Sequence, residues 1–135
     1  MVIDSSAIAA VFLNEPDWPF LNNQILMAER RLISAVSVVE TGMVLESRLG
    51  TVAVRGLQRY LEELRIEVVA VDAELAQAAL AAWRRFGRGR HRAALNLGDC
   101  FSYAVARSTG EPLLAKGDDF SRTDLNLCPQ APPAQ

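Results

Sequence analysis

Cysteine and histidine are both scarce in this chain of 135 residues. The two cysteines, Cys100 and Cys128, form no CxxC or Cys/His pattern, which argues against a disulfide scaffold and a structural zinc site. The single histidine, His91, excludes any mechanism that needs two. Because the first residues include an acid and lack the basic segment of a signal peptide, we expect reduced thiols in a cytoplasmic protein.

Long hydrophobic runs and a strong net charge are also missing. The apolar stretch near the start is far shorter than the roughly 20 residues of a membrane span, so no membrane partner is expected. Fourteen Lys+Arg against sixteen Asp+Glu give a net charge of −2, which excludes a generic basic nucleic-acid binder. The charge is unevenly spread, however, because residues 84–92 hold five arginines and no acid.

Short apolar stretches alternate with helical ones along the whole chain. Strands are expected at 1–4, 31–36, 66–71 and 112–115, with a short last one near 125–127. The expected helices are 7–13, 17–30, 37–49, 52–65, 73–86 and 99–108. This alternation is typical of an α/β domain with a mostly parallel sheet flanked by helices on both faces. We expect one domain at 1–128 and a Pro/Ala-rich flexible tail at 129–135.

Residues with short polar side chains mark where the helices begin. Ser5 and Ser6 are suited to cap the first helix, and Asp72 is suited to cap the helix at 73–86. Ser37 and Glu40 have the spacing of a capping box, which predicts that the third helix starts at 37.

Acidic residues fall at the ends of expected strands or in the helix starts that follow them: Asp4, Glu40, Asp99, and the adjacent Asp118 and Asp119. Each has a plain structural interpretation as a cap or turn residue. Ligands of open α/β sheets bind at this edge, however, and four acids there repel one another unless they are protonated or bind a cation. The set therefore favours a metal site.

The ligand types narrow the choice of metal and of chemistry. An all-oxygen set without His or Cys suits Mg²⁺ or Mn²⁺ rather than zinc. Asp4 and Asp99 are fixed at a strand end and a helix start, so we expect them to contact the ion. Glu40 and Asp119 would hold metal-bound waters or a second ion. Such a site suits phosphoryl chemistry, because the ion activates a water and binds phosphate oxygens.

The arginine-rich segment 84–92 reads RRFGRGRHR. Arg84 and Arg85 fit a solvated helix end, where they favour the helix dipole. Arg88, Arg90 and Arg92 lie past a glycine, and we interpret them as ligands for phosphates of a nucleic-acid backbone beside the metal site. His91, in the same segment, is expected to be an exposed polar residue. Trp83, Phe86 and Tyr103 are expected to belong to the core, because they have helical spacing.

Four segments, VIDSSA, SVVET, GRGRHRAALNLGDCFSYAVA and LLAKGDDFSRTDL, occur in that order from residue 2 to 125. Together they resemble the PIN-domain family, and within it the VapC toxins of bacterial type II toxin–antitoxin systems. The resemblance implies an α/β/α sandwich and a Mg²⁺- or Mn²⁺-dependent endoribonuclease. Its acidic set maps onto Asp4, Glu40, Asp99 and Asp119, with Asp118 and Asp124 ranked lower.

The resemblance also implies partners and a role for one hydroxyl group. Ser6 matches the family's small hydroxyl residue, which supports the first carboxylate or a water. Proteins of this kind are held inactive by a cognate VapB-type antitoxin that lays a peptide over the groove near the active site, and they commonly form homodimers.

Two other classes were weighed against this interpretation. A phospho-acceptor domain of the receiver type also has acids and a lysine near strand ends, and Lys116 is a candidate for that lysine. Such a domain needs a pair of acids after its first strand, whereas here Asp4 is followed by serines. A catalytically weak PIN-like binding module, acting through its antitoxin, is the remaining alternative. It gives no physical reason for keeping four mutually repelling carboxylates.

Overall fold

Four short parallel strands form the centre of the computed structural model, which describes residues 1–133. They are β1 (Val2–Ile3), β2 (Leu32–Ser34), β3 (Glu67–Val69) and β4 (Leu113–Leu114), in the order β3-β2-β1-β4. Every pairing is parallel, with Val2 opposite both Leu32 and Leu113. The expected strand near 125–127 is only an isolated bridge from Leu127 to Leu113.

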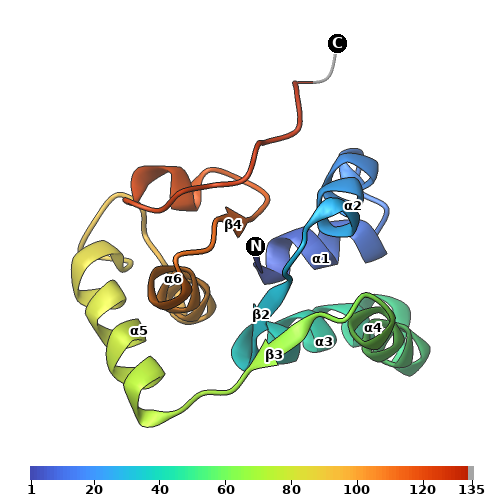
Figure 1. Ribbon diagram of the computed structural model, residues 1–135, viewed down its shortest axis with the longest axis horizontal. Helices are drawn as coiled ribbons and strands as arrows, with labels where there is room; N and C mark the ends of the chain where they lie inside the picture. The colour runs from blue at the N-terminus through green and yellow to red at the C-terminus, as the bar shows by residue number, and fades with distance from the viewer. Residues whose placement is uncertain (134–135) are drawn as a thin grey trace.

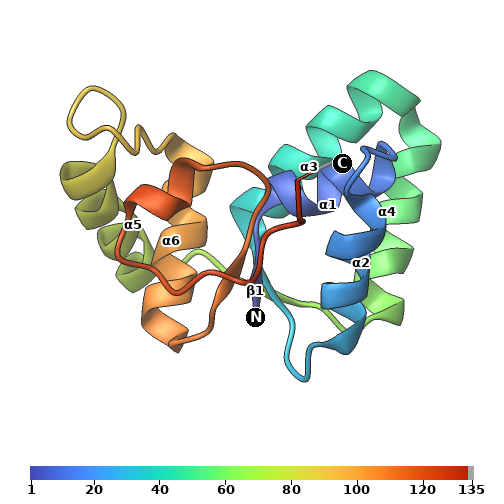
Figure 2. The same cartoon turned by 90° about the horizontal axis from the view of Figure 1, so that it is seen from above.

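Within residues 1–133, six α-helices and a short 3₁₀ helix cover the sheet (Figures 1 and 2). They are α1 (Ser5–Phe12), α2 (Trp18–Met27), α3 (Ala35–Leu49), α4 (Thr51–Glu63), α5 (Ala73–Phe86), α6 (Leu97–Thr109) and the 3₁₀ helix η1 (Asp119–Arg122). Figure 2 shows α5, α6 and η1 on one side of the sheet and α1 to α4 on the other. The expected α/β/α sandwich with a parallel sheet is confirmed.

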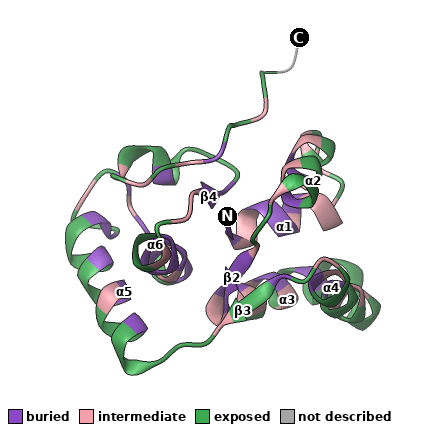
Figure 3. Cartoon of the chain, viewed as in Figure 1, coloured by how far each residue is buried: buried purple, intermediate pink, exposed green. Residues whose placement is uncertain are grey.

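The alternation of strand side chains divides the core into two halves. Val2, Leu32 and Leu113 pack with α5 and α6, whereas their neighbours in the strands pack with α1 to α4. These strand residues are fully buried, because helices cover both faces of a parallel sheet. Figure 3 shows burial concentrated at the sheet and on the inner helix faces. The edge strand β3 is the exception, since Glu67 and Val68 are exposed.

Two of the expected helix caps, those of α1 and α3, are wrong. The cap of α1 is Asp4, whose side chain accepts from Ser6 N–H, rather than a serine. Helix α3 begins at Ala35 and is capped by Ser34, so Ser37 forms no capping box with Glu40. In both places several capping residues stand close together, and the strand end decides which of them is used.

The other helix ends follow the sequence more closely. Helix α6 begins two residues before the expected start, because Asn96 is its cap and Asp99 completes a capping box with it. Asp72 caps α5 as expected, through its carboxylate and Leu75 N–H. Gly110 ends α6 in the left-handed conformation that glycine adopts without strain.

The last described residues run along the surface without regular secondary structure. Gln24 donates to the carbonyl of Pro129, and Gln130 donates to that of Ala115. Residues 134–135 lie outside the described residues, so the proposed tail at 129–135 stays a prediction. None of the helices in residues 1–133 has the length and apolar character needed to cross a membrane.

Candidate active site

Asp4 is the most tightly held acid at the carboxyl end of the sheet. Its backbone N–H donates to Leu114 in β4, and its side chain is almost fully buried. One carboxylate oxygen, Oδ2, accepts from Ser6 N–H (3.0 Å) and Ser6 Oγ (2.7 Å). The other, Oδ1, accepts from Ser102 Oγ of α6 at 2.7 Å. These bonds from two helices fix the orientation of the carboxylate.

Glu40 and Asp99 meet where α3 passes the start of α6. The Glu40 carboxylate lies against Gly98, so closely that a β-carbon at this glycine would overlap it. Asp99 follows Gly98 directly, and its Oδ2 accepts from the Asn96 N–H at 3.0 Å. Both acids are half-buried. The glycine therefore lets an acid of one helix approach an acid of the other.

The pKa values of Asp99 and Glu40 are both raised, which reflects their burial and the negative charges near them. Burial is the main cause that raises the pKa of Asp99 to about 7, and the hydrogen bond from the Asn96 backbone lowers it. The charges on Asp4, Asp119 and Glu40 raise the Asp99 pKa further. Burial and then the Asp4 charge raise the pKa of Glu40, while a hydrogen bond from Ser5 lowers it. The four expected acids therefore share one electrostatic environment.

The remaining acids of the C-terminal segment divide into two groups. Asp119 begins η1 on the exposed side of the site, and its neighbour Asp118 is also exposed. Asp124 is engaged elsewhere, because it accepts from Tyr103 Oη at 2.6 Å and pairs with Arg85 at 3.0 Å. The Tyr103 hydrogen bond lowers the pKa of Asp124. Asp124 is thus an anchor for α6.

The chemistry of the four acids fits a hard divalent cation. All donors are carboxylate oxygens, and their mutual repulsion is what a cation relieves. Within residues 1–133, no three Asp, Glu, His or Cys side chains lie close enough to form a ready-made metal-binding group. The acids influence one another by charge without forming a closed cage. Mg²⁺ tolerates this, because it keeps several waters and takes only one or two carboxylates directly.

Ser6 and Lys116 link Asp4 to the loop before η1. Ser6 Oγ accepts from the Lys116 N–H at 3.0 Å while it donates to Asp4. Among residues 1–133, the Lys116 ammonium group forms ion pairs with Glu15 and with Asp17 (3.2 Å), between α1 and α2, and not with the four site acids. This position removes the lysine that a receiver-type site would need.

The segment after α5 presents its arginines to solvent. Arg88, Arg90 and Arg92 are all exposed, and within residues 1–133 none of them forms an ion pair. Arg90 stacks over the Trp83 ring at 4.3 Å. The expectation of an exposed His91 is wrong, because its ring is half-buried, packs edge-on against Phe86, and accepts from a backbone N–H through Nδ1.

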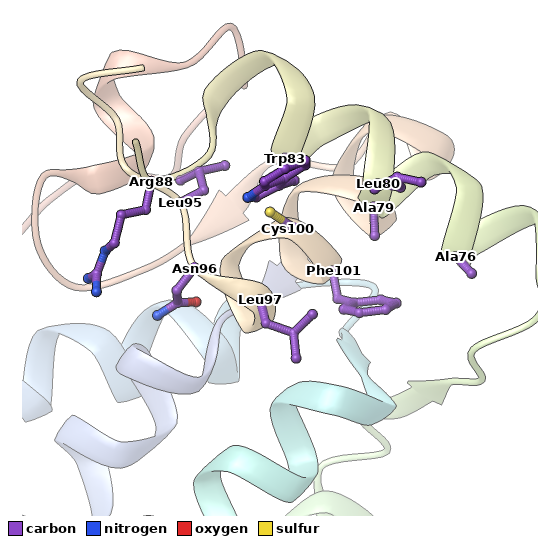
Figure 4. Close-up of a pocket in the computed structure, with 10 residues that line it drawn as sticks. All are labelled: Ala76, Ala79, Leu80, Trp83, Arg88, Leu95, Asn96, Leu97, Cys100 and Phe101. Atoms are coloured by element: carbon purple, nitrogen blue, oxygen red, sulfur yellow. The ribbon is translucent and has the colours of Figure 1, made fainter. Parts of the chain in front are cut away.

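A groove of about 490 Å³ lies between α5 and α6, directly beside the start of α6 (Figure 4). Figure 4 shows Trp83, Cys100 and Phe101 lining it, with Arg88 extending away at one end. Phe86 and Tyr103 are buried as expected, but Trp83 is 39% exposed and is not a core residue. Apolar side chains form most of this groove.

Two residues of the site escaped the sequence interpretation. Gly98 precedes Asp99 directly, and a glycine at an acid-bearing helix start is the signal that marks it. Ser102 lies three residues after Asp99, so the two side chains share one helix face. This spacing allows both of them to lie near Asp4. Nothing local distinguishes Ser102 from another small helical residue until α6 packs against β1.

Comparison with known proteins identifies the family of this chain. A model of the PIN domain matches residues 1–126. The chain therefore belongs to the PIN-domain family, as the sequence motifs indicated.

Within that family, the chain is similar to VapC proteins. It is 48% identical to Ribonuclease VapC of Mycolicibacterium smegmatis over 125 residues, which cover 93% of this chain and 97% of the relative. It is 46% identical to Ribonuclease VapC30 of Mycobacterium tuberculosis, over 93% and 95% of the two chains. The expected resemblance to VapC is confirmed.

Two solved structures share the fold. The crystal structure of Mycobacterium tuberculosis VapC20, a sarcin–ricin loop cleaving toxin, has a TM-score of 0.77 at 21% identity and covers 92% of this chain and 95% of its own. A toxin–antitoxin complex from Klebsiella pneumoniae has a TM-score of 0.66 at 15% identity and 89% coverage of both chains. At these identities the likeness concerns the fold.

Proposed function

We propose that this chain is a Mg²⁺- or Mn²⁺-dependent endoribonuclease and the toxin of a toxin–antitoxin pair. The observation that carries the proposal is the gathering of acids at the carboxyl edge of the sheet. Asp4 follows β1, and the Glu40 carboxylate lies against Gly98, directly before Asp99. The charge of Asp119 also acts on Asp99. Relatives named ribonucleases, at up to 48% identity over most of the chain, support the choice of RNA as substrate.

The four acids would bind the ion in two different ways. Asp4 and Asp99 would contact it directly, because hydrogen bonds fix one and a capping box fixes the other. Glu40 and Asp119 would orient waters around it or hold a second ion. When bound, the ion supplies Lewis acidity that activates a water and neutralises phosphate charge.

The arginine loop would hold the substrate. Arg88, Arg90 and Arg92 lack ion-pair partners among residues 1–133, so their charges are available to phosphates. Ser6 would keep the Asp4 carboxylate in place and help to bind the substrate or a water beside it. In-line attack of water on phosphorus would leave a 5′-phosphate and a 3′-hydroxyl. The scheme assigns no role to His91, whose Nδ1 accepts from the Ala93 N–H within the loop.

A VapB-type antitoxin and a second copy of the chain are the proposed protein partners. The shared fold with a chain of a toxin–antitoxin complex supports the first of these. The apolar groove between α5 and α6 borders the acids, so a peptide bound there would lie beside the site. We place the proposed protein in the cytoplasm, where its RNA substrate lies.

Sequencing of RNA 5′ ends after induced expression tests the proposal. Wild type should produce new 5′-phosphate ends at defined positions and arrest growth. Asp4→Asn should produce neither, while it accumulates to the same level as a folded protein. Equal cleavage by wild type and Asp4→Asn would overturn the proposed role of the acid. Folded, metal-bound wild type that cuts no RNA would favour the binding-module alternative.

A further inference from the structure

Three buried serine hydroxyls form a continuous hydrogen-bonded chain that ends on Asp4. Ser34 Oγ lies 3.0 Å from Ser37 Oγ, which lies 3.2 Å from Ser102 Oγ, which lies 2.7 Å from Asp4 Oδ1. All three serines are fully buried, so water does not compete for these bonds. Buried hydroxyl groups of this kind are costly unless they are paired, and each of these is paired.

The direction of the chain follows from counting protons. Each hydroxyl has one proton to donate. Ser102 gives its proton to Asp4, so Ser37 must donate to Ser102, and Ser34 donates in turn to Ser37. The three O–H dipoles therefore point the same way, toward the carboxylate. Hydrogen bonds aligned in this way strengthen one another in a buried setting.

The same chain ties together the elements that carry the acids. On α3, Ser37 lies three residues before Glu40, and on α6, Ser102 lies three residues after Asp99. Residues three apart share one helix face, so each serine sits one turn from the acid of its own helix. The contacts from Ser37 to Ser102 and from Ser102 to Asp4 thus join α3, α6 and the end of β1.

We propose that Ser102 is a positioning residue for Asp4, with Ser37 and Ser34 behind it, and that this chain sets the affinity of the site for a divalent cation. The inference rests on the proposed function. Without the Ser102 hydroxyl, Oδ1 loses its protein donor, and the carboxylate is held only through Oδ2 by Ser6. The orientation of the carboxylate is then fixed at one oxygen instead of two. Groups that orient a metal ligand typically change affinity by 10–100-fold when they are removed.

The test uses metal-free full-length protein titrated with Mn²⁺, with free Mn²⁺ measured by electron paramagnetic resonance. Ser102→Ala should weaken binding about 10-fold or more. Ser37→Ala should change it in the same direction by less, and it serves if Ser102→Ala does not fold. The matched control is Thr41→Val, which removes another fully buried hydroxyl of α3 that donates only to the Ser37 carbonyl. The control should lose thermal stability while it keeps the wild-type affinity for Mn²⁺.

The outcomes separate this inference from the proposed function. Wild-type Mn²⁺ affinity in folded Ser102→Ala or Ser37→Ala, or equal weakening in Thr41→Val, would overturn the positioning role. If wild type binds Mn²⁺ and Ser102→Ala binds it weakly, but neither cuts RNA, the positioning role stands and the ribonuclease proposal fails. Wild type that binds no Mn²⁺ would overturn both.

Discussion

The carboxylate of Glu40 lies against the backbone of Gly98, in the space that a β-carbon would fill. This contact joins α3 to α6 at the point where α6 presents Asp99. A β-carbon at position 98 would overlap the Glu40 carboxylate. Because this carboxylate is the end of a flexible side chain, it can move aside, so a substitution at 98 displaces Glu40 and leaves the backbone in place. The glycine is therefore tied to the arrangement of the acids more than to the stability of the fold.

Gly98→Ala should abolish most RNA cleavage while the protein stays folded. Alanine is favoured over glycine in a helix by about 1 kcal/mol, which offsets the displacement of Glu40. The measurement is the cleavage rate together with urea denaturation. Gly42→Ala, on α3 with open space around its β-carbon position, is the control and should keep full activity. Full activity in Gly98→Ala would show that the position of Glu40 does not matter.

Asp99→Asn should stabilise the metal-free protein against heat at pH 8. The pKa of Asp99 is raised from 3.8 to about 7, so the folded state loses stability as the pH rises from about 4 to about 7, and the full penalty remains above 7. The neutral amide carries no such penalty. In the presence of a chelator, the melting temperature of Asp99→Asn should therefore exceed that of wild type by more at pH 8 than at pH 5. A difference that is the same at both pH values would contradict the charge crowding.

Tyr103 and Asp124 should contribute to stability and not to catalysis. Tyr103→Phe removes a 2.6 Å hydrogen bond and should cost about 1 kcal/mol. Asp124→Ala removes the same bond together with the Arg85 ion pair, so the double variant should be little worse than Asp124→Ala alone. Because the pKa of Asp124 is lowered, this contribution is present above its ordinary value and is lost as the pH falls through the lowered one. Urea denaturation at pH 7 and pH 3 measures it. If the losses of unfolding free energy in the two single variants add up in the double variant, the hydrogen bond between Tyr103 and Asp124 is not their shared cause.

Arg88→Gln and Arg92→Gln should raise KM for RNA with little change in kcat. Each removed phosphate contact should also make the plot of log binding constant against log salt concentration less steep. For a single strand the slope should change by roughly 0.7 per contact. Arg55→Gln, an exposed arginine of α4 on the other side of the sheet, is the matched control. Equal effects in all three variants would point to net charge rather than to a binding loop.

Much of the fold could be predicted from the pattern of apolar residues. Because the helices of this domain are long and amphipathic, their ranges came within a few residues of the observed ones. The strands are only two or three residues long, so their ends depend on pairing with neighbours that lie far away in the sequence. The caps at Asp4 and Ser34 were missed for the same reason, since the strand ends select among several adjacent capping residues.

The gathering of the four acids at one edge could be predicted, because a charge at the end of a buried strand, as at Asp4, is costly and therefore conspicuous. Ser102 could not, because a buried serine in a helix has no periodic or local signature. Its role depends on the contact with Asp4, 98 positions away. His91 and Trp83 were misjudged because their environments come from the folding of the loop against Phe86 and Arg90.

The most direct test of the account is cleavage of a total RNA pool by purified metal-free protein before and after Mn²⁺ is added back. Wild type and Asp118→Asn should cut only with Mn²⁺ and leave 5′-phosphates, whereas Asp119→Asn should lose most of the activity under the same conditions. Asp118 and Asp119 are adjacent and both exposed, so the pair controls for charge and position. Cleavage that is as fast in chelator as in Mn²⁺ would contradict the metal-dependent mechanism.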